Sequence, residues 1–349
     1  LHLSIRRQRQ MCIRDSNQRV ITPGMIMRDE ATDFGGYTPH NFDHRYRGDI
    51  SVRNALSQSL NIPAVKVMEK IGVSSAVDTA QRMGLSTISH DQDYGLSLAL
   101  GAAEVEPLKM TNAYAAFANG GQQYTTTTIQ EIENKYGEVV YRHNPVAKRV
   151  QSEQASYLIS NILSDNSARA PTFGSSLNIS GRNVAVKTGS TDNNHDAWTI
   201  GYTPSLVVGV WVGNNENEAM SSGGSAMAGP IWRKSITAFL DGTNVEEFVR
   251  PSGIVEASIC RSNGFRATGN ATNTYNEVFL SGTVPTESCG SNTPPPSVDE
   301  EDTQPQTANN DTDGDGVREC HGCSTAEEGY KMEMEFMARV HYGQLNTLT

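Results

Sequence analysis

Two short clusters of polar side chains in this 349-residue chain contain residue types that can pass a proton, hold an amide or bind an anion. The first cluster is Ser59-Leu60-Asn61. On a tight turn, a Ser and an Asn two residues apart can aim a hydroxyl, which passes a proton, and a carboxamide, which holds an amide, into the same space. The alternative is helix capping, because Asn is a favourable N-cap residue and Asn61 lies just before Pro63.

The second cluster is Lys187-Thr188-Gly189-Ser190, which suits an anionic ligand with a carbonyl group. Lys187 supplies positive potential, and the hydroxyls of Thr188 and Ser190 can hydrogen-bond a carboxylate. Gly189 lets a ligand backbone approach closely, which leaves main-chain N–H groups as oxyanion donors. The alternative is a surface strand that ends in a solvated Lys and a Gly turn.

Helices are predicted on both sides of the first cluster. Ser51 is placed to cap a helix whose apolar residues begin at Val52, and Pro63 begins a second helix that stops at Gly72. The first cluster is therefore expected on a loop between two helices. Further helices are predicted at residues 74–83, 107–118 and 152–163.

The second cluster is expected on the first of three antiparallel strands, predicted at residues 183–190, 196–202 and 206–213. Side chains alternate along a strand. Lys187 and Gly189 therefore share one face, while Thr188 and Ser190 point to the other unless the strand twists or bulges.

Composition places the chain among ordinary soluble globular proteins, with 37% hydrophobic and 19% charged residues. A formal charge of −11 excludes a strongly basic nucleic-acid binder as the default interpretation. The charge is concentrated at the end of the chain, since residues 293–349 contain 12 acidic and 3 basic side chains. No apolar run approaches the roughly 18 to 20 residues that span a bilayer.

Composition also divides the chain into five segments. Residues 1–16 have no helical period, strand alternation or signal-peptide core, and we expect a non-native leader, the alternative being a disordered basic arm. Residues 17–249 carry the predicted helices and strands, and residues 250–290 form a small cysteine-bearing β module. Residues 291–310 are rich in Pro, Thr and acid, which predicts a disordered linker before an acidic tail at 311–349.

Cysteine spacing adds two expectations. Cys260 and Cys289 bracket the turn-rich module, where a disulfide worth about 3 to 4 kcal/mol is expected, against two buried free thiols. Cys320 and Cys323 form a single C-x-x-C, a weak zinc signal and equally a small disulfide. An oxidised pair would place the protein outside the cytoplasm.

The acidic tail contains half of a calcium-binding pattern. Asp311, Asp313 and Asp315 lie at alternate positions before a Gly, as in the first half of a calcium loop. The twelfth position is Gly322, where a bidentate Glu would be expected. A calcium-stapled segment and a merely acidic, disordered stretch both remain open, and we assign no metal ligand.

Together, the two polar clusters resemble two of the three motifs of the penicillin-recognising serine acyl transferases, Ser-x-Asn followed 126 residues later by Lys-Thr-Gly. The surrounding runs FGGYTPHNFDHRYRGDISVRNALSQSLNIPAVKV and VAVKTGSTDNNHDAWTIGYTPSLVVGVWVGNN are similar to the transpeptidase domain of class A penicillin-binding proteins, over about residues 20–238. The segment CRSNGFRATGNATNTYNEVFLSGTVPTESC resembles the small module that often follows that domain in the family.

The resemblance implies an α+β fold of the penicillin-binding and serine beta-lactamase type. It has a helical lobe and a lobe with an antiparallel sheet flanked by helices, with the site between them. The family's reaction is acyl transfer from D-Ala-D-Ala stem peptides of peptidoglycan, and beta-lactams acylate the same site. No cofactor is implied. In the family, a glycosyltransferase domain and a membrane anchor lie upstream, and the enzyme works on the periplasmic or cell-surface side of the inner membrane.

The resemblance also implies roles for the two clusters. Ser59 would relay a proton to the leaving group, Asn61 would hold the substrate amide, and Lys187 would supply positive potential. The hydroxyls of Thr188 and Ser190 would bind the terminal carboxylate. Gly189 would allow close approach, and the Ser190 N–H would be one oxyanion donor.

One motif of the family is absent from this sequence. The family's nucleophile and general base lie in a Ser-x-x-Lys upstream of Ser-x-Asn, and no Ser in this chain is followed three residues later by Lys. We expect an N-terminally truncated transpeptidase that is inactive by itself, because loss of the nucleophile removes most of the rate. The alternatives are a carboxypeptidase or beta-lactamase-like hydrolase and a non-catalytic cell-wall binding module.

Overall fold

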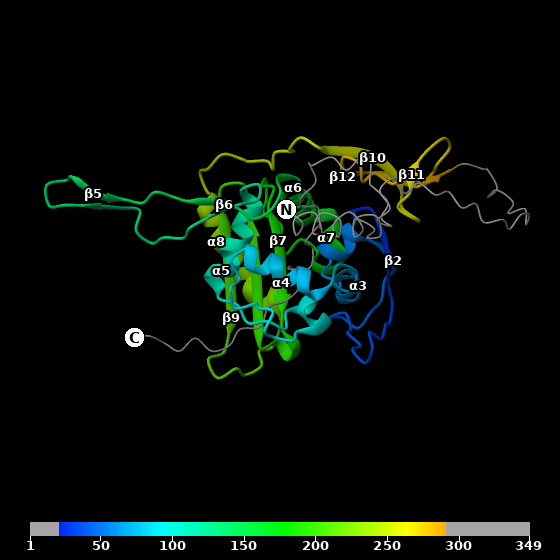
Figure 1. Ribbon diagram of the computed structural model, residues 1–349, viewed down its shortest axis with the longest axis horizontal. Helices are drawn as coiled ribbons and strands as arrows, with labels where there is room; N and C mark the ends of the chain where they lie inside the picture. Colours follow the sequence, from blue (N-terminus) through cyan, green and yellow to red (C-terminus); the bar gives the residue numbers. More distant parts are fainter. Residues whose placement is uncertain (1–20, 291–349) are drawn as a thin grey trace, which may run out of the picture.

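The computed structural model of the protein describes residues 21–290, and its arrangement is shown in Figure 1. One part of the body is a lobe of helices, joined to a short antiparallel pair formed by β1 (Ile26–Asp29) and β2 (Gly48–Ser51). The α-helices of this lobe are α2 (Val52–Ser57), α3 (Asn61–Ile71), α4 (Val73–Arg82), α5 (Pro107–Ala118), α6 (Glu153–Leu163) and α7 (Asn166–Phe173). A 3-10 helix, η1 (Gly95–Leu100), lies between α4 and α5.

The helices α2 to α6 lie close to the predicted residues, whereas α7 and η1 were not predicted. Ser51 is the N-cap of α2, and its hydroxyl accepts from the Asn54 N–H at 3.2 Å. Gly72 ends α3 with φ of 84°, a left-handed value that favours glycine. The predicted second helix begins two residues earlier than expected, at Asn61, because its first turn tolerates Pro63.

The second lobe is built on a three-stranded antiparallel sheet in the order β7-β8-β9. Its strands are β7 (Ala185–Ser190), β8 (Asp196–Tyr202) and β9 (Val207–Gly213). The pairing aligns Lys187 with Ile200 and Ser190 with Ala197. The three predicted strands are therefore confirmed, with a short 3-10 turn, η2 (Asp192–Asn194), joining the first two.

A layer of helix covers each face of this sheet. The long helix α8 (Gly224–Leu240) packs on one face, where Trp232 and Ile236 form a core with Val186. On the other face, Trp198 and Tyr202 join the core of the helical lobe. A Cβ atom on Gly201 would lie 2.4 Å from the Trp232 ring, so only glycine permits this close packing.

A separate four-stranded sheet follows α8 and lies against the helical lobe (Figure 1). It comprises β10 (Ile254–Cys260), β11 (Arg266–Ala267), β12 (Thr274–Leu280) and β13 (Ser288–Cys289). We call residues 254–289 the C-terminal module. Cys260 and Cys289 form a disulfide with Cα atoms 6.4 Å apart, which confirms that pairing over two free thiols.

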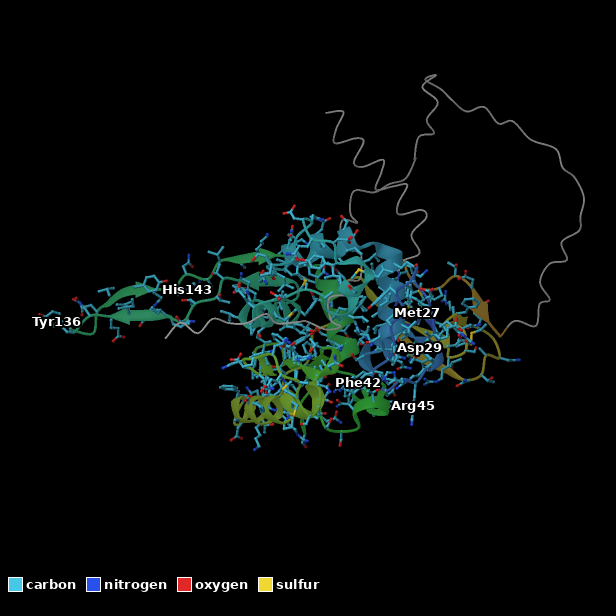
Figure 2. The ribbon with its side chains drawn as sticks, turned by 90° about the horizontal axis from the view of Figure 1, so that it is seen from below. Met27, Asp29, Phe42, Arg45, Tyr136 and His143 are labelled. Carbon is cyan, nitrogen blue, oxygen red and sulfur yellow. A yellow bond between two sulfur atoms is a disulfide. The ribbon has the colours of Figure 1, made fainter. Side chains whose placement is uncertain are left out.

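A hairpin projects from the body as a separate arm (Figures 1 and 2). Its strands are β4 (Glu131–Glu133) and β5 (Val139–Arg142), and Tyr136 at its tip is 76% exposed. Beneath it, β3 (Gln122–Tyr124) pairs with β6 (Ala147–Arg149) where the arm joins the body. The sequence had given no prediction for this arm.

Several predictions concern residues outside 21–290. The leader at 1–16, the linker at 291–310 and the acidic tail at 311–349, with its cysteine pair and half calcium loop, lie outside the described residues. The predicted boundaries between segments stay predictions. Within residues 21–290, no helix is long and apolar enough to cross a membrane.

Candidate functional site

The two polar clusters meet between the lobes. Lys187 Nζ on β7 donates to Ser59 Oγ at 2.6 Å, and these residues are 128 positions apart in the chain. The ammonium also donates to the Thr188 carbonyl oxygen at 2.7 Å. Lys187 is only 5% exposed, so the solvated surface lysine of the alternative interpretation is excluded.

Ser59 lies on a tight turn between α2 and α3. Its N–H donates to the Leu56 carbonyl at 3.1 Å, and the next N–H, that of Leu60, donates to Ala55 at 2.9 Å. Ser59 has φ of 59°, a left-handed conformation that costs a non-glycine residue about 1 to 2 kcal/mol. The turn therefore holds the hydroxyl towards Lys187 at the expense of backbone strain.

Asn61 is oriented by a neighbouring loop. It is the first residue of α3 and is buried, and its side-chain amide donates to the His40 carbonyl. Its N–H donates to Asn41 Oδ1 at 2.8 Å. The capping interpretation of Asn61 is wrong, because Leu60 is the N-cap residue and the side chain that satisfies the helix N-terminus belongs to Asn41.

Two residues that support this turn were missed in the sequence. Asn41 Nδ2 donates to both carboxylate oxygens of Asp29, at 3.0 and 2.9 Å, and Asp29 is fully buried. The Arg47 N–H also donates to Asp29, at 2.8 Å. Asn41 and Asp29 are single polar residues and belong to no helical or strand periodicity that would mark them as buried. The one available signal was that Asn41 and Arg47 lie within the run HNFDHRYRG, which carries part of the resemblance.

Thr188 and Ser190 lie on the face of β7 opposite to Lys187, as the strand alternation predicts. Ser190 Oγ accepts from the Gly224 N–H at the start of α8, at 2.7 Å. A Cβ atom on Gly223 would lie 2.3 Å from Ser190 Oγ, so the start of α8 approaches this hydroxyl closely. The structure therefore does not direct the Lys187 and Ser190 side chains into one space.

The outer edge of β7 is open within residues 21–290, because β7 has only β8 as a neighbour. The Thr191 N–H donates to the Asp196 carbonyl of β8. Main-chain N–H and C=O groups alternate in direction along a strand, so every second residue counted from Thr191 points these groups towards β8. The main-chain groups of Ser190 and Thr188 then point to the open edge. Gly189 lies between them without a side chain, so an extended ligand can approach this edge closely.

An apolar pocket adjoins the Ser59 to Lys187 contact. Ser59 and Lys187 supply the polar groups of its wall. The other lining residues are Met27, Val52, Ala55, Leu56, Leu60, Pro63, Ala64 and Val67. Asn61, Thr188 and Ser190 are not among them, so the pocket brings together only two of the six predicted site residues.

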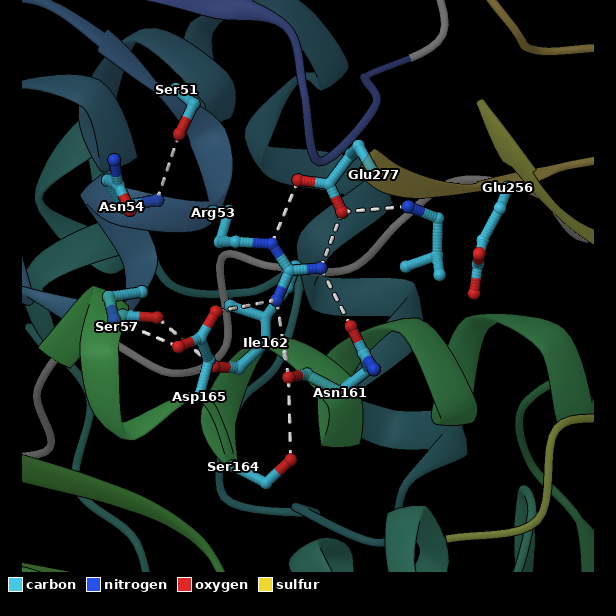
Figure 3. A network of polar contacts seen from close by, with 12 residues as sticks. Ser51, Arg53, Asn54, Ser57, Asn161, Ile162, Ser164, Asp165, Glu256 and Glu277 are labelled. Atoms are coloured by element: carbon cyan, nitrogen blue, oxygen red, sulfur yellow. Dashed lines mark hydrogen bonds and ion pairs between the residues drawn. The ribbon is translucent and has the colours of Figure 1, made fainter. Parts of the chain in front are cut away.

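A second polar network lies on the same helix as the Ser59 turn (Figure 3). Arg53 on α2 donates to both carboxylate oxygens of Glu277 on β12, at 2.8 and 2.5 Å. The same guanidinium reaches Asn161 Oδ1 at 2.7 Å and Asp165 at 3.3 Å. Arg53 thus joins α2, α6 and the C-terminal module.

This network is largely removed from water. The Glu277 side chain is 0% exposed and that of Arg53 is 12% exposed. Burial alone lowers the pKa of Arg53, but the hydrogen bond and charge of Glu277 outweigh it, so the pKa of Arg53 is raised. Sequence reasoning missed this pair, since each residue has an ordinary surface-type side chain and the two are 224 positions apart.

Metal chemistry has no candidate site in the part of the chain that the structure describes. No group of three or more His, Cys, Asp and Glu side chains is placed to hold an ion there. The half calcium loop lies outside that part.

Comparisons with known proteins agree with this geometry. Residues 13–237 match the family model of the penicillin-binding protein transpeptidase domain, a match that begins within the expected leader. Residues 250–294 match the model of the penicillin-binding protein 1A C-terminal domain.

Similar proteins are much longer than this chain. A penicillin-binding protein 1A of Clostridium botulinum is 29% identical over 259 residues, covering 72% of this chain and 31% of that protein. One from Neisseria flavescens is 31% identical over 226 residues, covering 63% of this chain and 28% of that protein. The chain therefore spans less than a third of the curated relatives it matches.

Among solved structures, penicillin-binding protein 1A from Haemophilus influenzae matches with a TM-score of 0.69 and 25% identity, over 79% of this chain and 47% of that chain. PonA1 from Mycobacterium tuberculosis matches with a TM-score of 0.60 and 25% identity, over 66% of both chains. The expected fold, of the penicillin-binding and beta-lactamase type, is confirmed. The chain belongs to the class A penicillin-binding proteins, with a transpeptidase domain followed by a penicillin-binding protein 1A C-terminal domain.

Proposed function

We propose that this chain provides the Ser-x-Asn and Lys-Thr-Gly side of a peptidoglycan D,D-transpeptidase site. The observation that carries the proposal is the contact between Lys187 Nζ and Ser59 Oγ at 2.6 Å, which joins the two motifs across the lobes. A buried ammonium beside a hydroxyl stabilises the hydroxyl's oxygen when it gives up a proton. Ser59 can then relay that proton to a leaving amine.

The open edge of β7 supports the rest of the assignment. An extended stem peptide that approaches this edge meets the Ser190 N–H, which we assign as one oxyanion donor. The hydroxyls of Ser190 and Thr188 are assigned to the terminal carboxylate, and Gly189 to close approach. The side chain of Ser190 faces α8, where its oxygen accepts from the Gly224 N–H. To bind a carboxylate, the Ser190 hydroxyl must therefore donate its own proton from this position or rotate slightly.

Asn61 is assigned to the substrate amide, with Asn41 and Asp29 as its supports. Its carboxamide currently donates to His40, so the proposed role uses the remaining capacity of the amide group. The buried carboxylate of Asp29 fixes Asn41, and Asn41 fixes the start of α3. This arrangement holds Asn61 two residues from the proton-relaying Ser59.

The nucleophile is proposed to come from a Ser-x-x-Lys segment that this sequence does not contain. The apolar pocket beside Ser59 and Lys187 is the proposed place for that segment, since a nucleophile there lies next to both groups. The chain alone is therefore proposed to be inactive.

In the whole protein we propose acylation by beta-lactams, action outside the cytoplasm, an upstream glycosyltransferase domain and a membrane anchor. The disulfide at Cys260 supports an oxidising compartment.

The test is covalent labelling of the complete gene product with a fluorescent penicillin, after sequencing the native gene upstream of residue 17. Labelling that requires a Ser-x-x-Lys serine is expected. Lys187→Ala should slow it by about 10² to 10⁴-fold, whereas Lys148→Ala, on the exposed strand β6, should leave the rate unchanged. A complete product with Ser-x-x-Lys that stays unlabelled contradicts the proposal.

Two other outcomes would replace it. Rapid hydrolysis of penicillin would favour the carboxypeptidase or beta-lactamase-like alternative. Binding of stem peptides without any acylation, in a product whose native sequence has no Ser-x-x-Lys, would favour the non-catalytic cell-wall binding module.

A further inference from the structure

The C-terminal module grips the first turn of α2, the helix that leads to Ser59 (Figure 3). Both carboxylate oxygens of Glu277 on β12 accept from the Arg53 guanidinium, at 2.8 and 2.5 Å. The same carboxylate accepts from the Val278 N–H at 2.9 Å, so the main chain of β12 helps to fix its position. Glu277 therefore links the module directly to α2.

A second contact joins the module to the same turn. The first two N–H groups of α2 have no helical partner, and they donate to the carbonyls of residues 25 and 23, both at 2.9 Å. Gly24 lies between these carbonyls and is covered by β10, because a Cβ atom there would lie 2.3 Å from Ile259 Cδ1. The module therefore holds the start of α2 both directly, through Glu277, and through residues 23–25.

The helix α2 and the turn at Ser59 form one unit. The helix has six residues and a length of about 9 Å, which is too short to be stable alone, so its direction depends on the groups that hold it. After its last turn, the N–H groups of residues 58–60 donate to carbonyls of residues 54–56. A movement of α2 therefore carries the Ser59 hydroxyl with it, whereas Lys187 stays in place on β7.

Arg53 is shared between the module and the helical lobe. On the side of the lobe, both Arg53 and Ser57 bond to the stretch 161–165 at the end of α6, Ser57 through the Ile162 carbonyl at 3.1 Å. Glu277 is the partner that draws Arg53 towards the module. Without this carboxylate, Arg53 and the first turn of α2 would shift towards α6.

We propose that the C-terminal module positions the Ser59 hydroxyl for proton relay, with Glu277 as the positioning residue that acts through Arg53 and α2. The inference rests on the proposed function of Ser59. The Ser59 Oγ lies 2.6 Å from Lys187 Nζ, and a shift of α2 by a fraction of an ångström disturbs this contact. Since a misplacement of about 1 Å can slow a reaction about a hundredfold, partial loss of the grip should slow acylation about tenfold.

The first test is the kinetics of penicillin acylation of the complete gene product carrying Glu277→Gln. This variant keeps the side-chain shape but turns an amide N–H towards an Arg53 N–H, donor against donor. Stopped-flow labelling separates the dissociation constant of the first complex from the rate constant of acylation. The rate constant should fall about tenfold, and the dissociation constant should stay unchanged, because ligand binding is assigned mainly to β7.

The matched control is Glu256→Gln, since Glu256 pairs with Arg250 at the surface of the same module, and it should leave both constants unchanged. An unchanged rate constant in folded Glu277→Gln, or a change confined to the dissociation constant, overturns the proposal.

Two further variants separate position from folding. Glu277→Asp keeps a charge beside Arg53 but is one methylene shorter, so it should slow acylation about threefold while the thermal unfolding midpoint falls less than in Glu277→Gln. Leu240→Ala removes a buried side chain at the end of α8, in the other lobe, and lowers the unfolding midpoint without touching α2. Its acylation rate constant should stay unchanged. Equal slowing by Leu240→Ala and Glu277→Gln overturns the proposal.

Hydrogen exchange of this chain by itself gives a readout that needs no acyl transfer. In Glu277→Gln, the amides of residues 55–60 should exchange about tenfold faster than in Glu256→Gln, whereas Leu240→Ala should not single out these amides. Equal exchange at residues 55–60 in the two glutamine variants overturns the proposal. A complete product that penicillin does not label would contradict the proposed function, and the exchange measurement would still decide whether the module holds the turn.

Discussion

The first turn of α2 and the loop that follows the helix are held in opposite ways. In the first turn, Arg53 is bonded by Glu277, Asn161 and Asp165 in a largely buried network. After the helix, Ser59 adopts a left-handed conformation, and its hydroxyl contacts Lys187 beside an apolar pocket. The comparison teaches that α2 is anchored at its first turn, away from the proposed chemistry. This anchoring allows the strained backbone of Ser59 to persist after the last turn of the helix.

The largest expected effect comes from breaking the anchored end. Glu277→Gln removes the shorter of the two ion pairs of the buried Arg53 and leaves only the 3.3 Å contact with Asp165, which should lower the free energy of unfolding by about 3 to 5 kcal/mol. Urea denaturation followed by circular dichroism measures the change. Glu256→Gln is the matched control, because Glu256 pairs with Arg250 at the surface of the same module, and its loss should cost at most about 1 kcal/mol. Equal effects of the two variants would contradict a buried anchor.

The next effect removes the covalent support of the module. Replacing Cys260 and Cys289 by Ala opens a loop of 29 residues and should lower the free energy of unfolding of the module by about 3 to 4 kcal/mol. Unfolding is measured with and without a thiol reductant. The unchanged chain should respond to the reductant and the double variant should not; an unchanged chain that is insensitive to reductant would show that the disulfide adds nothing to the anchor.

A smaller effect tests strain at the Ser59 turn. Both Ser59→Gly and Ser59→Ala lose the hydroxyl, but only Gly relieves the left-handed backbone, so Ser59→Gly should be about 1 kcal/mol more stable than Ser59→Ala. Ser57, the last residue of α2, gives a control of opposite sign, because Gly is about 1 kcal/mol less favourable than Ala within a helix. The four variants are compared by thermal unfolding. Ser59→Ala at least as stable as Ser59→Gly would remove the argument for strain.

The smallest effect concerns alkaline pH. Burial raises the pKa of Tyr275 to about 12, above its ordinary value of 10. The unfolded chain therefore loses this proton first, and the stability from Tyr275 is complete below pH 10 and falls as the pH rises from 10 towards 12. Urea denaturation at pH 9 and pH 11 should show a smaller loss of stability for Tyr275→Phe than for the unchanged chain. The same loss in both would contradict the assignment.

The sequence predicted the local parts of this comparison and not the distant ones. Alternation along residues 183–190 placed Lys187 and Ser190 on opposite faces of a strand, and Ser51 marked the start of α2, because both rules depend only on neighbouring residues. The pairing of Arg53 with Glu277 depends on a fold that brings together residues 224 positions apart. No local pattern signals such a partner.

The same reason explains the orientation of Asn61. Its position between two helices was expected from the cap at Ser51 and from Pro63, but its place as the first residue of α3 and its hydrogen bonds to His40 and Asn41 depend on a loop that precedes α2. The resemblance supplied the fold and the pairing of the two motifs. The projecting arm at β4 and β5 was missed, because its short strands have neither a long period nor a buried face.

The contact between Gly224 and Ser190 has an electrostatic consequence. Gly224 is the first residue of the 17-residue helix α8, whose aligned peptide dipoles give its N-terminus a partial positive charge. Because the Gly224 N–H donates to Ser190 Oγ, this hydroxyl is polarised and becomes a stronger donor to a further acceptor. An anion bound to Ser190 would therefore feel the field of a whole helix, transmitted through one serine, and its affinity would depend on α8 remaining seated against β7.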